Sequence, residues 1–118
     1  MAKFLFVLSR GMDDPVRSTR CFHLAKVARE GGHDVHIFLV DDGVTVSKIG
    51  MADHMVSPTG DELKGLLDFH VKGKTPIYVC TPCANARHMG DEELVDGARF
   101  ETAKVLISLA AESQVLTF

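Results

Sequence analysis

Long apolar runs are absent from this sequence, and cysteines are few. Its 118 residues include three cysteines, and no stretch approaches the roughly 20 apolar residues that a membrane-spanning helix needs. The first apolar run, Phe4 to Leu8, is shorter than the apolar region of a signal peptide and has no small-residue cleavage site before Arg10. Three cysteines without an export signal favour free thiols in a reducing compartment over a disulfide framework. We therefore expect a cytoplasmic protein with no membrane partner.

An excess of charge of either sign is also absent. The formal net charge is −3 and the isoelectric point is about 6.0, so no general attraction to nucleic acid or to an anionic membrane is expected. The fractions of hydrophobic residues, 46%, and of charged residues, 25%, are ordinary for a soluble globular protein. The length is that of one domain, which we place at residues 1–118.

Signature motifs of several large enzyme classes are missing as well. The chain contains no Walker loop, GxGxxG, HExxH or GxSxG motif. Nothing in the sequence therefore supports a nucleotide-binding, dinucleotide-binding, metalloprotease or serine-hydrolase function. We expect no bound cofactor.

What the sequence does contain is a regular alternation of strand and helix signals. Short apolar runs predict strands, and apolar residues at i, i+3, i+4 and i+7 predict helices. This pattern predicts strands at 4–8, 35–40, 77–80 and 114–118, and helices from Pro15 to the glycines at 31–32, around 63–70, over 82–89 and over 102–109. Residues 43–60 fit a short helix or an irregular connection, and 90–101 have room for a short fourth strand.

This order of elements indicates the fold class. Strands separated by helices imply right-handed crossovers and a parallel sheet that is covered on both faces. No linker, repeat or low-complexity tract interrupts the pattern. The prediction is a single α/β layer sandwich.

The residues that are the clearest candidates for a chemical role lie in "IYVCTPCANARHMG", residues 77–90. Cys80 ends a predicted strand, and chemistry in open α/β sheets collects at the carboxyl ends of the strands. Thr81 is expected to cap the following helix and Pro82 to occupy its first position, which places Cys83 in the first turn. A thiol there tends toward a lowered pKa, and the thiolate is the reactive form. Arg87 lies four residues beyond Cys83 on the same helical face, where it could add positive charge.

The remaining cysteine and the histidines have simpler interpretations. Cys21 falls on the predicted core-facing stripe of the first helix and is expected to pack rather than react. His70 shares an apolar helical face and is expected to be a boundary residue with its polar atoms satisfied, rather than a ligand. His88 is interpreted as an ordinary surface histidine. Met51 and Met55 are expected to fill gaps or an interface. The spacing of the other histidines indicates no role: His23, His33, His36 and His54.

The run "GKTPIYVCTPCANARHMGDEELVDGARF", followed by a helix and a terminal "VLTF", resembles the DsrE/DsrF-like family of small sulfur-relay and sulfur-reduction proteins. "GGHDVHIFLVDDGV" and the leucine-bearing helix before the cysteine strand support the resemblance, which covers nearly the whole chain. It implies a three-layer α/β/α sandwich with a five-stranded, mainly parallel sheet, and assembly into trimers or hexamers. It also implies that Cys80 accepts sulfur as a persulfide, that Cys83 matches a second cysteine found in some relatives, and that Arg87 matches the family's arginine. In many relatives a glycine follows that arginine directly, whereas here it comes at Gly90.

Three functions remain open on the sequence. The first is a sulfur carrier or sulfurtransferase-like protein that holds sulfur on Cys80, uses Cys83 as a resolving thiol, and works with donor and acceptor proteins as a homo-oligomer. The second is a dithiol redox switch, although no tryptophan precedes the pair as in thioredoxins. The third is a binding module for a small anion near the strand ends, or for a metal whose ligands would have to be completed by His88, His70 or Cys21, or by a site shared between subunits.

Overall fold

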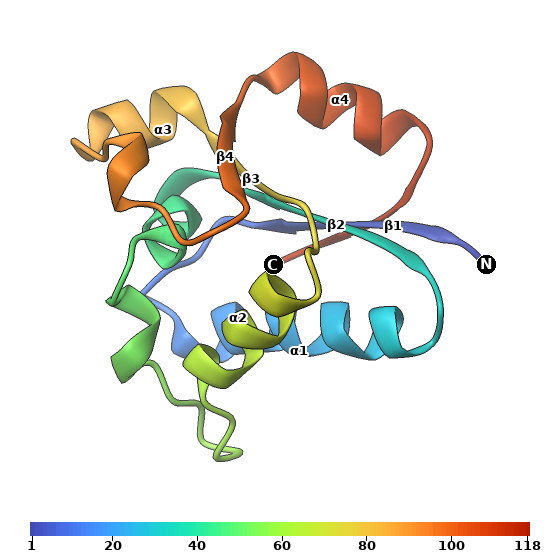
Figure 1. Ribbon diagram of the computed structural model, residues 1–118, viewed down its shortest axis with the longest axis horizontal. Helices are drawn as coiled ribbons and strands as arrows, with labels where there is room; N and C mark the ends of the chain where they lie inside the picture. Colours follow the sequence, from blue (N-terminus) through green and yellow to red (C-terminus); the bar gives the residue numbers. More distant parts are fainter.

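Five parallel strands form the centre of the protein, and helices lie on both sides of them (Figure 1). The computed structural model describes residues 1–118. The strands follow the order β4-β3-β2-β1-β5 across the sheet and are β1 (Lys3–Leu8), β2 (Asp34–Leu39), β3 (Ile77–Cys80), β4 (Ala98–Glu101) and β5 (Gln114–Thr117). The four α-helices are α1 (Pro15–Glu30), α2 (Leu63–Lys72), α3 (Thr81–Ala86) and α4 (Ala103–Ala111). The predicted three-layer α/β/α class and the parallel sheet are confirmed.

The central strands are the most apolar because their side chains are buried on both faces of the sheet. Leu5, Phe6 and Leu8 of β1 are buried, and so are Ile37 and Phe38 of β2. The short fourth strand, for which the sequence left room, forms as β4 and pairs with β3 along its whole length. It is an edge strand of only four residues, which explains why its apolar signal was weak.

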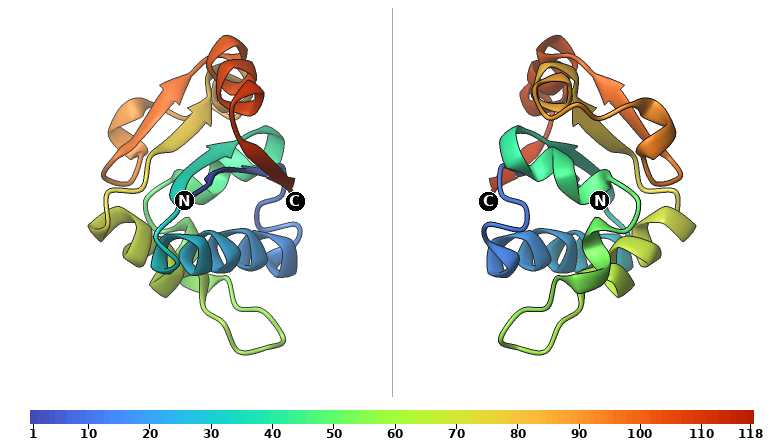
Figure 2. Two further views of the ribbon diagram at one scale, coloured as in Figure 1. Left: turned by 90° about the vertical axis from the view of Figure 1, so that its right-hand side faces the viewer. Right: turned by 90° about the vertical axis from the view of Figure 1, so that its left-hand side faces the viewer.

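The layer formed by α1 and α2 holds most of the core. Figure 2 shows both helices below the sheet, with α4 above it. Cys21 and Phe22 of α1 are fully buried, as the predicted stripe requires. His70 of α2 is also fully buried: its Nε2 donates to the carbonyl of Phe22 at 3.0 Å, and its Nδ1 accepts from the Thr75 hydroxyl at 2.9 Å. The prediction that the polar atoms of His70 are satisfied is confirmed, whereas its predicted place at the boundary is wrong because it lies fully inside the core.

The opposite layer is thin. There α4 places Leu109 against a small buried cluster formed by Leu5, Phe38 and Tyr78. Both nitrogens of the half-buried His36 have partners, because Nδ1 lies 2.8 Å from the Tyr78 hydroxyl and Nε2 lies 3.2 Å from a carboxylate oxygen of Asp34. Polar groups therefore occupy part of a sheet face that one short helix covers.

The uncertain segment 43–60 contains most of one 3-10 helix, η1 (Asp41–Ser47), and all of a second, η2 (Met51–His54). Val44, Val46 and Met55 are buried against the main core, so the apolar residues of this segment are largely used for packing. Ile49 and Val56 are more than half exposed. None of the helices in the protein has both the length and the apolar character needed to cross a membrane.

Candidate functional site at the carboxyl edge of the sheet

The cysteine pair lies where β3 passes directly into α3. Cys80 is the last residue of the strand, and Cys83 lies in the first turn of the helix. Both are free thiols and both are half-buried. Cys80 packs beside both hydrophobic clusters, so one side of it faces the protein interior. The sequence placed both cysteines correctly relative to the strand and the helix.

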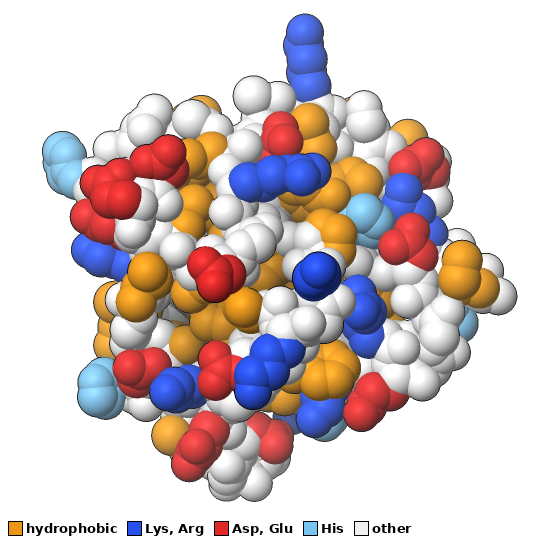
Figure 3. Space-filling model, in the orientation of Figure 1, with side chains coloured by type: hydrophobic (Ala, Val, Ile, Leu, Met, Phe, Trp, Pro, Cys, Tyr) orange, Lys and Arg blue, Asp and Glu red, His pale blue; other side chains and the backbone are white.

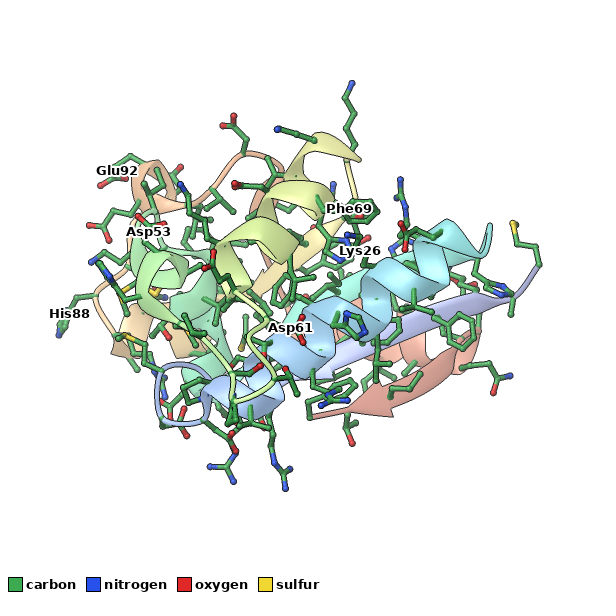
Figure 4. The ribbon with its side chains drawn as sticks, turned by 90° about the horizontal axis from the view of Figure 1, so that it is seen from below. Lys26, Asp53, Asp61, Phe69, His88 and Glu92 are labelled. Atoms are coloured by element: carbon green, nitrogen blue, oxygen red, sulfur yellow. The ribbon has the colours of Figure 1, made fainter.

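The ends of α3 differ from the prediction. Thr81 is not the cap: its hydroxyl donates to the carbonyl of Glu101 on β4 at 3.0 Å, and the cap position is occupied by Cys80. The helix ends at Ala86 rather than at residue 89. The chain turns there because His88 adopts a left-handed conformation with φ of 55°. His88 is exposed and projects away from the body of the protein (Figure 4), as expected of a surface histidine.

The connection from β2 into η1 brings a third group to the pair. The backbone N–H of Asp41 donates to Sγ of Cys83 at 3.2 Å, and the same Sγ lies 4.0 Å from Oδ1 of Asp41. Asp41 has φ of 50°, a left-handed value that is uncommon outside glycine and for which aspartate and asparagine are enriched. One residue therefore presents both a hydrogen-bond donor and a carboxylate to Cys83.

Arg87 joins the same connection to α3. Its Nε and Nη2 donate to Oδ1 of Asp42 at 3.2 and 2.7 Å, and its Nη1 donates to the carbonyl of Cys83 at 3.0 Å. The hydrogen bond with Asp42 raises the pKa of Arg87. The guanidinium thus lies beside the pair, but its charge is offset by Asp42 and its nearest contact at Cys83 is the carbonyl, not the sulfur.

Two glycines allow this connection to lie against the end of β1. A Cβ on Gly43 would come within 2.2 Å of the carbonyl oxygen of Leu8, and a Cβ on Gly11 within 2.5 Å of the carbonyl oxygen of Asp42. Real side chains do not make such contacts, so both positions need glycine for a close backbone approach. The position of Asp41 and Asp42 is therefore fixed by packing on two sides.

The two thiols have different electrostatic surroundings. Burial is the main cause that raises the pKa of Cys80, and a hydrogen bond with the side chain of Cys83 raises it further. The backbone N–H of Cys83 faces the sulfur of Cys80 and acts in the opposite direction. The pair is thus a protonated, inward-facing thiol next to a thiol that receives the Asp41 N–H.

No cavity encloses the pair. The largest cavity, about 620 Å³, lies beside the start of β4 and the connection into β3, and is lined by residues such as Lys72, Lys74 and Arg99. A smaller one of about 260 Å³ reaches Asp42 but neither cysteine. No three His, Cys, Asp or Glu side chains are grouped so that they could hold a metal ion. Cys21 is fully buried, and burial raises the pKa of its thiol.

Sequence reasoning missed Asp41 and Asp42 as site residues. The sequence shows "DDG" closing a predicted strand, but the side-by-side position of β2 and β3 appears only in the strand order. The carboxyl ends of neighbouring parallel strands lie at the same edge of the sheet, so functional groups that follow those strands come close together. That rule would have pointed to the pair of aspartates once the two strands were known to be neighbours.

Comparisons with known proteins agree with the fold. The chain is 31% identical over 117 residues to the protein MJ0989 of Methanocaldococcus jannaschii, covering 98% of this chain and 99% of that one. It is 29% identical to the protein MK0008 of Methanopyrus kandleri, covering 95% and 89%. Among solved structures, ychN of E. coli superposes over the full length of both chains with a TM-score of 0.84 at 24% identity. MTH1491 of Methanobacterium thermoautotrophicum does so with 0.74 at 14%.

The family assignment rests on the match to a family model. The model of the DsrE/DsrF-like family matches residues 2–118, which is nearly the whole chain. The strand, cysteine and helix segments on which the sequence resemblance was based all lie within this match. The protein belongs to the DsrE/DsrF-like family.

Proposed function

We propose that the protein is a sulfur carrier that holds sulfane sulfur as a persulfide on Cys80 and uses Cys83 as a resolving thiol. The observation that carries this proposal is the placement of the two thiols: both are free and half-buried, and they lie together where β3 passes into the first turn of α3. Membership in a family associated with sulfur relay supports it.

The chemistry needs two steps. In loading, the thiolate of Cys80 attacks the outer sulfur of a donor persulfide, so that Cys80–S⁻ and R–S–SH become Cys80–S–SH and R–S⁻. An acceptor thiolate then takes the outer sulfur in the same way. Without an acceptor, the thiolate of Cys83 attacks the inner sulfur, which forms a Cys80–Cys83 disulfide and releases HS⁻. The raised pKa of Cys80 means that loading requires removal of its proton.

The open position of the pair supports protein partners as donor and acceptor. No cavity that could enclose a small substrate includes either cysteine, whereas a cysteine on a partner's surface can approach the carboxyl edge of the sheet. Arg87 acts here as a positioning residue, because it ties α3 to the β2 connection through Cys83 and Asp42. We further propose a homo-oligomer, a trimer or hexamer, in the cytoplasm, with the exposed Ile49 and Val56 as interface candidates.

The first experiment is intact-mass spectrometry after incubation with a persulfide donor. We expect the wild type to gain the mass of one sulfur atom, Cys80→Ser to gain none, and Cys83→Ser to keep the added sulfur for longer. Cys21→Ala is the matched control, because this third cysteine is buried and should not affect loading. Sulfur loading in Cys80→Ser at the wild-type level would contradict the proposal.

A dithiol redox switch is the second candidate, and the same placement of two free thiols at the junction of β3 and α3 favours it. Its outcome in the same experiment is a loss of two hydrogens on mild oxidation without any gain of sulfur. A Cys80–Cys83 reduction potential within the cytosolic range would support this function. The metal-binding alternative has no ligand cluster to support it.

A further inference from the structure

Arg87 is the single cationic side chain that contacts the pair, and its charge is already paired with Asp42. Arg87 directs two of its nitrogens at one oxygen of Asp42, at 2.7 and 3.2 Å, and its third contact is a carbonyl oxygen. An anionic sulfur compound that approached the thiols would therefore find no free positive side chain among these contacts. The site differs in this respect from anion-binding sites, in which arginine forks point at the ligand.

Asp41 adds a negative charge that forms no ion pair and that Arg87 meets only at longer range. Its carboxylate is exposed, forms none of the ion pairs of the protein, and has an oxygen 4.0 Å from Sγ of Cys83. With Asp42 balanced by Arg87, the charges of these three side chains sum to one negative charge beside the thiols. Asp91 and Glu92, on the 3-10 helix η3 (Asp91–Glu93), are likewise exposed and without ion-pair partners. Figure 3 shows acidic side chains gathered at its upper left, over the end of the molecule with α3 and η3.

On the basis of the proposed function, we propose that Asp41 determines the class of sulfur donor by charge. A cysteine persulfide flanked by lysine or arginine on a partner protein is favoured, and small inorganic anions such as thiosulfate or polysulfide are disfavoured. The physical reason is that oppositely charged groups are steered together and like charges are kept apart at this range. The backbone N–H of Asp41 still donates to the sulfur of Cys83. Asp41 therefore stabilises the thiolate through its backbone and selects the sulfur donor through its carboxylate.

The arrangement is built into the backbone. Asp41 has a left-handed conformation and lies two residues before Gly43. Position 43 must be glycine because a Cβ there would collide with the carbonyl oxygen of Leu8. Asparagine accepts the same conformation and keeps the same backbone N–H. Asp41→Asn therefore removes the charge while it preserves the geometry at Cys83, which makes it the variant of choice.

The test measures how fast Cys83 reacts with two disulfides of similar size and opposite charge. Cystamine carries two ammonium groups and dithiodiglycolate carries two carboxylates. Each transfers one half to the thiolate and releases the other half as a thiolate, so the mixed disulfide is read directly by mass spectrometry. A Cys80→Ser background leaves Cys83 as the one half-buried thiol and prevents an internal disulfide.

At low ionic strength we expect cystamine to react about tenfold faster than dithiodiglycolate, after each rate is divided by the rate of the same reagent with the neutral thiol 2-mercaptoethanol to remove the difference between the two leaving thiolates. The ratio should fall severalfold in Asp41→Asn, and should approach one in about 1 M salt, where the screening length is about 3 Å. Glu30→Gln, at the far end of α1, is the matched control and should keep the ratio of its background. Equal or faster reaction of the anionic reagent at low salt, or an unchanged ratio in Asp41→Asn, would overturn the inference.

A second measurement separates this inference from the proposed function. Loading of wild-type Cys80 is compared with the persulfides of cysteamine and of thioglycolate as donors. We expect faster loading from the cationic donor. Loading at equal rates from both would overturn the donor selection even though sulfur is carried. A failure to load from either, together with a retained disulfide ratio, would contradict the carrier function and leave the charge selection at Cys83 standing.

Discussion

The layer formed by α1 and α2 and the carboxyl edge of the sheet contain the same reactive residue type in opposite surroundings. Cys21 lies in the first region, with no exposed surface and a pKa raised by burial. Cys80 and Cys83 lie in the second region and are half-exposed, and the sulfur of Cys83 accepts a hydrogen bond from the backbone N–H of Asp41. Burial and loop contacts, not residue type, therefore decide which thiol is available for chemistry.

His70 and His88 repeat the comparison. His70 is held between α1 and the start of β3 with both nitrogens bonded, while His88 extends from the surface near the cysteine pair. We therefore expect the first region to govern stability and the second to govern reactivity. The two properties should respond to different substitutions, and the predictions below test this separation.

The largest expected effect is the loss of stability on Phe22→Ala. Phe22 is fully buried in the main core, and its ring packs edge-on against the ring of His70 with 5.7 Å between the ring centroids. Removal of its ring should lower the free energy of unfolding by about 3–5 kcal/mol, because it leaves a cavity as well as removing buried apolar surface. Denaturant unfolding measures this value. Val27→Ala, on the exposed side of the same helix, should change it by less than about 0.5 kcal/mol.

Alkylation of the native protein sharpens that result. If the two regions are independent, Phe22→Ala should leave the rates at Cys80 and Cys83 unchanged under conditions where the variant is still folded. A changed rate at the pair in the folded variant would show that the core also controls the site, and the separation would be wrong.

A smaller effect is expected from the titration of His70. Burial is the main cause that lowers its pKa, so near pH 6 the unfolded chain binds a proton that the folded protein does not. Stability should therefore fall as the pH falls below the unfolded value of about 6.5. The slope for one group is at most about 1.4 kcal/mol per pH unit, and it ends below the lowered pKa.

The difference between wild type and His70→Gln isolates this contribution. Urea unfolding at pH 7.5, 6.5 and 5.5 should show a steeper loss of stability in the wild type, since carboxylates contribute equally to both proteins. Parallel pH profiles would mean that His70 does not lose its proton on folding, in conflict with its bonds to Phe22 and Thr75.

Much of this organisation was predictable from sequence because it depends on local patterns. The apolar runs at Phe4–Leu8 and Ile77–Cys80 predicted strands, and Pro82 after Cys80 predicted the helix that places Cys83 in its first turn. The burial of Cys21 followed from the helical stripe. These inferences need only neighbours along the chain.

The parts that the sequence did not predict depend on contacts across the fold. Thr81 could have capped α3, but the carbonyl of Glu101 on the adjacent strand takes its hydroxyl. The contact of Asp41 with Cys83 joins residues 42 positions apart and requires β2 and β3 to be neighbours. Glycine at position 43 signals a close approach only when the end of β1 is seen beside it.

The smallest stability effect and a clear reactivity effect are expected from Arg87→Gln. The ion pair between Arg87 and Asp42 is largely exposed, so its loss should lower the free energy of unfolding by less than about 1 kcal/mol.

Without the guanidinium, the carboxylate of Asp42 stands unbalanced beside the thiols and disfavours the thiolate. Alkylation of Cys83 by neutral iodoacetamide at pH 7 should therefore slow about threefold in Arg87→Gln. The double variant Arg87→Gln/Asp42→Asn removes both charges and should restore most of the wild-type rate, which distinguishes charge from altered packing. A large loss of stability, or a slow rate that the second substitution does not restore, would mean that Arg87 holds the structure of α3, and that stability and reactivity are joined at this edge after all.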